Sequence, residues 1–249
     1  MPRQTLYKPP HPQLEEWPPA RSDHLLHSDE PARDVYLDSC AQIAAAVAPH
    51  GFKYTESKQR CHREHRGFGN TINFQSSRYN ASGRHVQLWM HATVSSHVLQ
   101  AWRAERLPAE LSTEYLAGGM VHLLGTRYAF VQWELADPAD RAATIADAVS
   151  FIHDEVLPYF SLFEEPATLI ARLMDQTLPG LDLRPSVEFA YCYGSKEQAQ
   201  LVLDRFIRER PDMHDAIIIE QSRASPSLLM APTSYAEQVA FLRTQYRLT

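Results

Sequence analysis

The chain has 249 residues, 44% of them hydrophobic, which is enough for one large domain or two small ones with a conventional core. No run of about eighteen apolar residues offers a membrane span, and residues 1–30 lack the apolar block of a secretory signal. We therefore expect a cytoplasmic protein with no membrane partner. The three cysteines, Cys40, Cys61 and Cys192, form no C-x-x-C motif, which argues against a disulfide framework and a four-ligand zinc site.

The net charge of -6 is unevenly distributed. Residues 53–84 contain seven basic and two acidic residues, so this stretch carries +5 and the remainder -11. A protein that is acidic overall is a poor general ligand for phosphate backbones, so we do not expect nucleic acid to be its main partner. A local basic face can still meet an acidic partner. The same arginines also fit a second interpretation, in which they are solvated and keep a sheet edge from pairing.

Residues 1–31 form a proline-rich arm that is expected to be extended. It either docks on a partner or lies across its own domain, with Leu14 and Trp17 as anchors. After the arm, apolar residues recur at helical spacing as far as the Pro49-His50-Gly51 stop, and they predict the first helix: Tyr36, Cys40, Ile43, Ala44 and Val47.

The clearest pattern in the chain is the stretch TINFQSSRYNASGRHVQLWMHATV, residues 71–94. From Val86 to Val94 apolar residues alternate with polar or aromatic ones, which is typical of a half-buried strand. Ile72 and Phe74 alternate in the same way upstream, and residues 79–83 supply a turn. The two runs therefore predict an antiparallel hairpin.

Further elements follow from similar patterns. Residues 52–65 predict a strand or a pair of strands, residues 99–106 a helix, and residues 128–135 a further strand. The stretch up to Gly118-Gly119 is expected to be loop with a short helix. Asp137 and Pro138 predict the start of an amphipathic helix that Pro158 ends, and a shorter helix is expected over residues 166–174.

Beyond residue 178 only helices are expected. Ser195-x-x-Gln198 and Ser234-x-x-Glu237 are helix-start motifs, and residues 190–211 resemble one helix pair of a tetratricopeptide-type repeat. The predicted fold class is α+β: an antiparallel β-meander sheet packed by helices on one face, followed by a small helical tail. The predicted parts are the arm (1–31), the sheet domain (32–177) and a helical C-terminal region packed on it (178–249).

Several short motifs in one order carry a family resemblance: HGFKY, TINFQSSRYN, VQWELAD and VLPYFSLFEEPATLIARL. Over residues 34–174 they resemble the bacterial domain of unknown function 4304. That family has no assigned activity, so the resemblance implies a fold and no catalytic residue. Small α+β domains of this kind often resemble immunity proteins, which neutralise a cognate toxin by covering its active surface.

The motif Cys61-His62-Arg63-Glu64-His65 is the best candidate for enzyme chemistry. On a strand Cys61 and His65 share one face, about 13 Å apart, while His62 and Glu64 lie on the other, so one metal ion cannot bind them all. No G-x-S-x-G, phosphate-binding glycine loop or H-E-x-x-H motif is present. We therefore expect no catalytic residue, cofactor or metal, and keep an enzyme of unrecognised type as an alternative.

The outer face of the hairpin carries the sharper hypothesis. Trp and Arg are the side chains that most often supply binding energy at interfaces. If helices cover the Val86, Leu88 and Met90 side, we expect the opposite face to bind a protein partner, such as a cognate toxin. Its predicted residues are Asn73, Gln75, Arg78, Arg84, Gln87, Trp89 and His91. Two alternatives remain: the arm or the tail covers Trp89 as core, or the helical tail is a scaffold that recruits other proteins.

Overall fold

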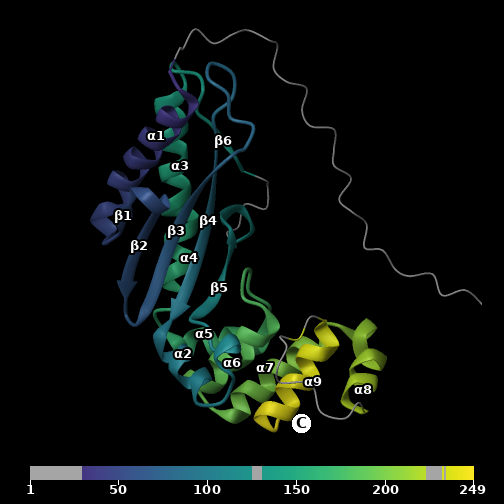
Figure 1. The fold of residues 1–249 in the computed structure, drawn as a ribbon. Coiled ribbons are helices and arrows are strands. Elements are labelled where there is room, and N and C mark those ends of the chain that lie inside the picture. The colour runs from purple at the N-terminus through teal and green to yellow at the C-terminus, as the bar shows by residue number, and fades with distance from the viewer. Residues whose placement is uncertain (1–29, 125–130, 223–231, 233) are drawn as a thin grey trace, which may run out of the picture.

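The computed structural model describes residues 30–124, 131–222, 232 and 234–249. In these residues a six-stranded antiparallel sheet stands above a group of helices at one end (Figure 1). The predicted α+β meander with a helical C-terminal part is confirmed. The strands are β1 (Lys53–Thr55), β2 (Arg60–His65), β3 (Phe68–Ser76), β4 (Gln87–Ser96), β5 (Tyr115–Met120) and β6 (Trp133–Glu134).

The sheet is a meander in which β1 to β5 pair in chain order, and β6 pairs with the first residues of β4. Ile72 pairs with Ala92 and Phe74 with Met90, so the predicted hairpin has the predicted faces. Asn80 holds its turn together, because its Oδ1 accepts from the backbone N–H of Gln87 at 2.9 Å. The apolar set Val86, Leu88, Met90, Ala92 and Val94 is 0–1% exposed.

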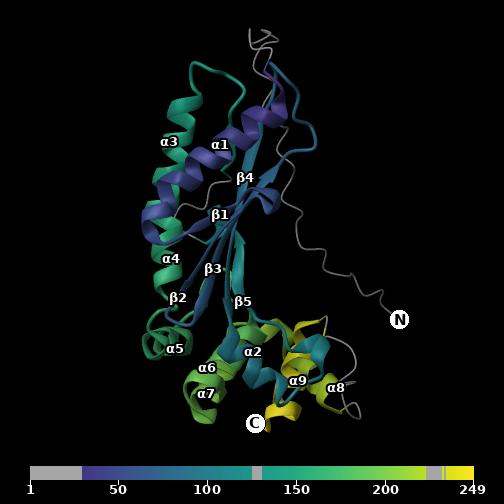
Figure 2. The ribbon, with the colours of Figure 1, turned by 60° about the vertical axis from the view of Figure 1, so that its left-hand side comes forward.

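Helices cover only one face of the sheet among the described elements, as Figure 2 shows. They are α1 (Ala32–Val47), α3 (Arg141–Phe151), the π-helical turn η5 (Ile152–Val156) and α4 (Leu157–Ser161). The expectation that Pro158 ends this helix is wrong. A proline removes one backbone donor and clashes with the preceding turn. The chain widens to a π-turn just before Pro158, with Leu157 N–H bonded to Ile152 O, and the helix continues.

Strand β5 (Tyr115–Met120) corrects a second expectation, because the stretch up to Gly118-Gly119 was expected to be loop with a short helix. Gly118 pairs with Thr93 at φ +148°, a backbone conformation that L side chains rarely adopt. A Cβ atom at this position would clash with the carbonyl oxygen of Ala92 and lie 2.8 Å from Cα of Thr93. Close approach to β4 therefore makes the strand, against the low strand propensity of glycine. Of the strand expected at 128–135, residues 133–134 are β6, while 125–130 lie outside the described residues.

The remaining helices form a lobe at one end of the sheet: α2 (His97–Ala104), α5 (Pro166–Asp175), α6 (Leu183–Tyr193), α7 (Lys196–Arg208), α8 (His214–Ser222) and α9 (Tyr235–Tyr246). Short turns of 3-10 helix complete the chain: η1 (Ala48–His50), η2 (Glu56–Lys58), η3 (Ala109–Leu111), η4 (Val121–Leu123) and η6 (Pro211–Met213). Ser234 and Glu237 form the predicted capping box of α9. Within the described residues, no helix is long and apolar enough to cross a bilayer.

Sheet and lobe share one apolar core. The ring of Phe68 on β3 lies 6.3 Å from Phe189 and 5.6 Å from Tyr193, both on α6. Ser96 is the last residue of β4 and also the N-cap of α2, because its Oγ accepts from Leu99 N–H at 3.0 Å. The same Oγ lies 2.6 Å from the hydroxyl of Tyr193. The sheet therefore leads into the lobe without a linker.

A buried ionic network joins three helices of the lobe. Glu188 on α6 is fully buried, and its carboxylate accepts from Nε of Arg103 on α2 and from Nε of Arg184, both at 2.7 Å. The hydroxyl of Tyr246 on α9 donates to it at 2.8 Å. Arg103, 3% exposed, also donates to the carbonyls of Thr113 and Tyr115 at 2.7 Å. With its partners in place, the buried charge is satisfied.

Candidate functional site

We call the side of the sheet away from α1, α3 and α4 the open face. Strand alternation and register place its side chains in rows across β2, β3 and β4. One row holds Arg60, Asn73 and His91, and the next holds His62, Thr71 and Thr93. The half-buried or exposed residues of these strands on this side are Arg60, His62, Glu64, Thr71, Asn73, Gln75, Trp89, His91, Thr93 and Ser95.

Side chains of β2 and β3 fix one another on this face. Nε2 of His62 lies 2.9 Å from the carboxylate of Glu64, and Nδ1 of His62 lies 2.9 Å from Thr71 Oγ1. Both ring nitrogens of His62 are therefore engaged, which holds the imidazole in one orientation. His97, at the start of α2, lies 3.9 Å from Glu64 and 3.3 Å from Glu114.

The hairpin half of the face is fixed in the same way. Nε2 of His91 lies 2.9 Å from Oε1 of Gln75, and the indole N–H of Trp89 donates to Oε1 of Gln132 at 3.3 Å. Trp89 and His91 are half-buried, and Gln75 is exposed. Trp89 is thus neither core nor fully exposed, and its indole is held by Gln132, the residue directly before β6.

A hollow of about 350 Å³ lies on the open face where β2, β3 and β4 meet the start of α2. The side chains around it include Arg60, His62, Glu64, Asn73 and Tyr115. Gly69 on β3 lies against residues that line it. A Cβ atom on Gly69 would crowd the hydroxyl of Ser95 and lie 3.0 Å from the Glu64 carboxylate. The hollow is polar, and its size suits one or two side chains of a partner.

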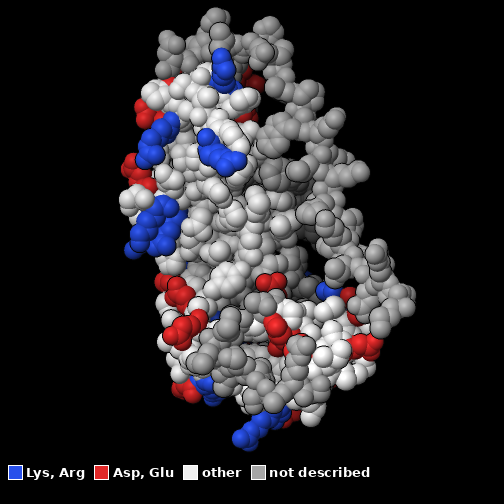
Figure 3. All heavy atoms as spheres, turned by 45° about the vertical axis from the view of Figure 1, so that its right-hand side comes forward, with Lys and Arg blue, Asp and Glu red and all other residues white. Residues whose placement is uncertain are grey.

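Charged side chains of both signs lie on the surface that Figure 3 shows. Basic and acidic side chains occur in its upper part and in its lower part, with much uncharged surface between them. Basic Arg60 and acidic Glu64 and Glu114 line the hollow itself. Such mixed charge favours a protein partner with complementary groups over a uniform polyanion.

The structure brings four of the predicted binding residues together on the open face: Asn73, Gln75, Trp89 and His91. Gln87 shares this side but is only 9% exposed, because the hairpin turn packs over it. Arg78 and Arg84 lie beyond the ends of β3 and β4, in the turn, where both are exposed. The guanidinium of Arg78 stacks on the ring of Tyr79, 4.6 Å from its centroid.

The motif at residues 61–65 is divided between the two faces of β2. Cys61 points into the core with no exposed surface, and burial raises the pKa of its thiol to about 12. Burial also raises the pKa of Cys40 to about 12, so neither thiol forms a reactive thiolate at neutral pH. His65, on the helix side, lies 3.5 Å from Glu164. Within the described residues, no group of three or more His, Cys, Asp or Glu side chains is arranged to hold a metal ion.

Sequence reasoning missed the residues around the hollow on β2 and beside α2: Arg60, Ser95, Glu114 and Tyr115. The alternation in residues 60–65 placed His62 and Glu64 together, but it did not show which strand β2 pairs with. Once β2 is paired with β3, Arg60 lies opposite Asn73, next to the predicted residues.

No family model, curated protein or solved structure matches this chain. The resemblance of residues 34–174 to the bacterial domain of unknown function 4304 therefore stays a prediction.

Proposed function

We propose that this protein is a non-catalytic, immunity-type binding protein that neutralises a cognate bacterial toxin by covering the toxin's active surface with its open face. The observation that carries the proposal is a polar and aromatic sheet face that no described helix covers. Its side chains are ordered by bonds among themselves. The toxin as partner comes from the family resemblance and is part of the proposal.

The order of the face supports tight binding. Side chains that are already fixed lose less conformational entropy when a partner docks, so more of the contact energy appears as affinity. The contacts of His62 with Thr71 and Glu64, and of His91 with Gln75, supply this order. A strand framework also holds the groups more rigidly than loops would.

The composition of the face supports a protein partner. Its hairpin end holds Trp89, one row from His91, and Arg84 is exposed in the turn beyond. Aromatic and arginine side chains are the ones that most often dominate the binding energy of protein interfaces. The hollow next to Asn73 offers a recess into which a partner side chain fits.

The test is binding and growth rescue with a toxin encoded by a neighbouring gene. We expect co-expression of the wild-type protein to restore growth. We expect Trp89→Ala to weaken toxin affinity by at least about 2 kcal/mol, the level of an interface hot spot, and Arg84→Ala to weaken it less. Gly69→Ala would crowd Ser95 and Glu64, two residues that line the hollow, and should also weaken binding.

Arg172→Ala is the matched control, because Arg172 is an exposed arginine on α5, away from the open face. Its affinity should equal that of the wild type. Circular dichroism and urea unfolding of each variant separate loss of binding from loss of folding. Equal affinities for the wild type and for the Trp89→Ala and Arg84→Ala variants would refute the proposed face.

A further inference from the structure

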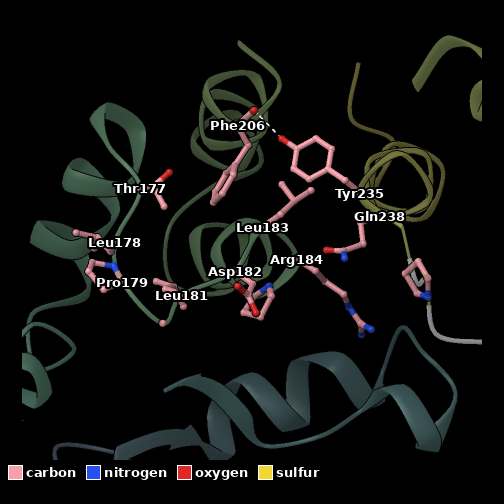
Figure 4. A pocket seen from close by; sticks show the side chains of 13 residues that line it. Thr177, Leu178, Pro179, Leu181, Asp182, Leu183, Arg184, Phe206, Tyr235 and Gln238 are labelled. Carbon is pink, nitrogen blue, oxygen red and sulfur yellow. Dashed lines mark hydrogen bonds between the residues drawn. The ribbon is translucent and has the colours of Figure 1, made fainter. Parts of the chain in front are cut away.

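The lobe contains a second recess, the C-terminal cleft, which lies outside the open face. It has a volume of about 610 Å³ and is enclosed by the segment before α6, the first turn of α6, the end of α7 and the start of α9. Figure 4 shows its side chains converging from these elements. Its walls are mainly proline, leucine and aromatic: Pro179, Leu181, Leu183, Pro185, Phe206 and Tyr235.

The two rings of the cleft are held in place. The hydroxyl of Tyr235 donates to the backbone carbonyl of Phe206 at 2.6 Å, which joins α9 to α7 across the cleft. The guanidinium of Arg205 lies 3.7 Å from the centroid of the Phe206 ring. Fixed aromatic walls of this kind are the surfaces on which proline-rich segments dock, since such segments are already extended before binding.

Polar groups in the cleft define what such a segment must carry. Asp182 precedes α6 as its N-cap, is exposed, and makes no side-chain cap bond. No hydrogen bond or ion pair of its carboxylate is found among the described residues. The side chain of Gln238 on α9 also lines the cleft. A polyproline segment has unpaired carbonyls that an amide can bond, and a cationic residue in it would pair with Asp182.

The chain itself contains such a segment outside the described residues. Residues 8–12 read Lys-Pro-Pro-His-Pro, and residues 17–19 read Trp-Pro-Pro. The described chain starts at Glu30, whose carboxylate pairs with Arg141 at 2.8 Å beside the start of α3. This is the end of the sheet opposite the lobe (Figure 1). Any arm segment that enters the cleft must therefore run along the sheet.

Chain length selects between the two segments. Strand β4 alone, with ten residues, spans about 34 Å of the way. The eleven residues from 19 to 30 would span about 34 Å as polyproline and leave no slack, whereas the twenty residues from 10 to 30 would span about 62 Å. Residues 8–12 also contain Lys8, whose ammonium group can pair with the carboxylate of Asp182.

We propose that residues 8–12 of this chain's own N-terminal arm dock in the C-terminal cleft, with prolines against Phe206 and Tyr235 and Lys8 beside Asp182. The arm then ties the first residues of the chain to its last helices. This inference does not depend on the open face or on a toxin.

The test is disulfide trapping in the full-length chain. Pro10→Cys is combined with Gln238→Cys in a Cys192→Ser background, since Cys40 and Cys61 are buried. Mild oxidation should give an intramolecular disulfide, seen as a faster-migrating monomer on a non-reducing gel. The control pairs Pro10→Cys with Leu201→Cys, an exposed position on α7 that does not line the cleft, and it should give little product.

A charge exchange provides the second measurement. Asp182→Lys should slow disulfide formation by about twofold to fivefold, the effect of one exposed ion pair, and adding Lys8→Glu should restore the rate. A disulfide-linked dimer would show that the arm of a second copy fills the cleft, and it would overturn docking within one chain. Product no greater than in the Leu201→Cys control would overturn the proposal entirely.

Discussion

Removing the carboxylate of Glu188 should lower the free energy of unfolding by far more than removing an exposed carboxylate would. The carboxylate has no exposed surface and accepts from Arg103, Arg184 and Tyr246 at 2.7, 2.7 and 2.8 Å. Truncation in Glu188→Ala leaves the guanidinium of Arg103, 3% exposed, buried without its counter-ion. Breaking such a buried pair destabilises by about 3–5 kcal/mol.

The measurement is urea unfolding followed by circular dichroism, with the free energy extrapolated to water. Glu165→Gln is the matched control, because Glu165 also bonds an arginine, Arg66, at 2.6 Å, but its side chain is 70% exposed. An exposed pair of this kind contributes at most about 1 kcal/mol. If Glu188→Ala and Glu165→Gln lowered the free energy of unfolding equally, the reasoning on the buried network would be refuted.

Two further predictions concern Gly118 and the three thiols. Gly118→Ala should lower the free energy of unfolding by about 1–3 kcal/mol more than Gly67→Ala does. Both glycines have positive φ, but of the two only Gly118 has backbone atoms where a Cβ would be. Equal losses in urea unfolding would contradict the close approach of β5 to β4. In the native protein at pH 8, a thiol reagent should modify half-buried Cys192 first and should reach buried Cys40 and Cys61 only on unfolding. Burial raises the thiol pKa to about 11 for Cys192 and to about 12 for Cys40 and Cys61, so all three react slowly in the native protein. Fast native modification of Cys61, located by mass spectrometry, would contradict its place in the core.

The hairpin was predictable because one local rule decides it. Side chains on a strand alternate, so residues 86–94 reveal their buried face without any knowledge of the rest of the fold. The capping box at Ser234 is equally local, since both of its partners lie within one turn.

The errors arise where distant residues decide the local conformation. Strand β5 exists because Gly118 lets it approach β4, and strand propensity alone argues against it. The helix passes Pro158 because a π-turn absorbs the lost donor, and nothing in the spacing of apolar residues signals that turn.

The same limit applies to the binding face. Alternation assigned Trp89 and His91 to one side, and the structure places them there with Asn73 and Gln75. The hollow depends on the pairing of β2 with β3 and on the path of α2, which brings His97 and Glu114 to within 3.3 Å of each other. Pairing between strands is a tertiary property, so the residues that complete the site could not be read from one strand at a time.

The continuity at Ser96 has a mechanical consequence. One residue ends the longest strand, caps the following helix and contacts Tyr193 of the lobe, so no linker separates the two parts of the molecule. The buried core that both parts share also opposes their separation. A partner that docks on the strands would therefore meet the lobe as a neighbouring surface, and a load on the sheet would pass to the lobe through Ser96.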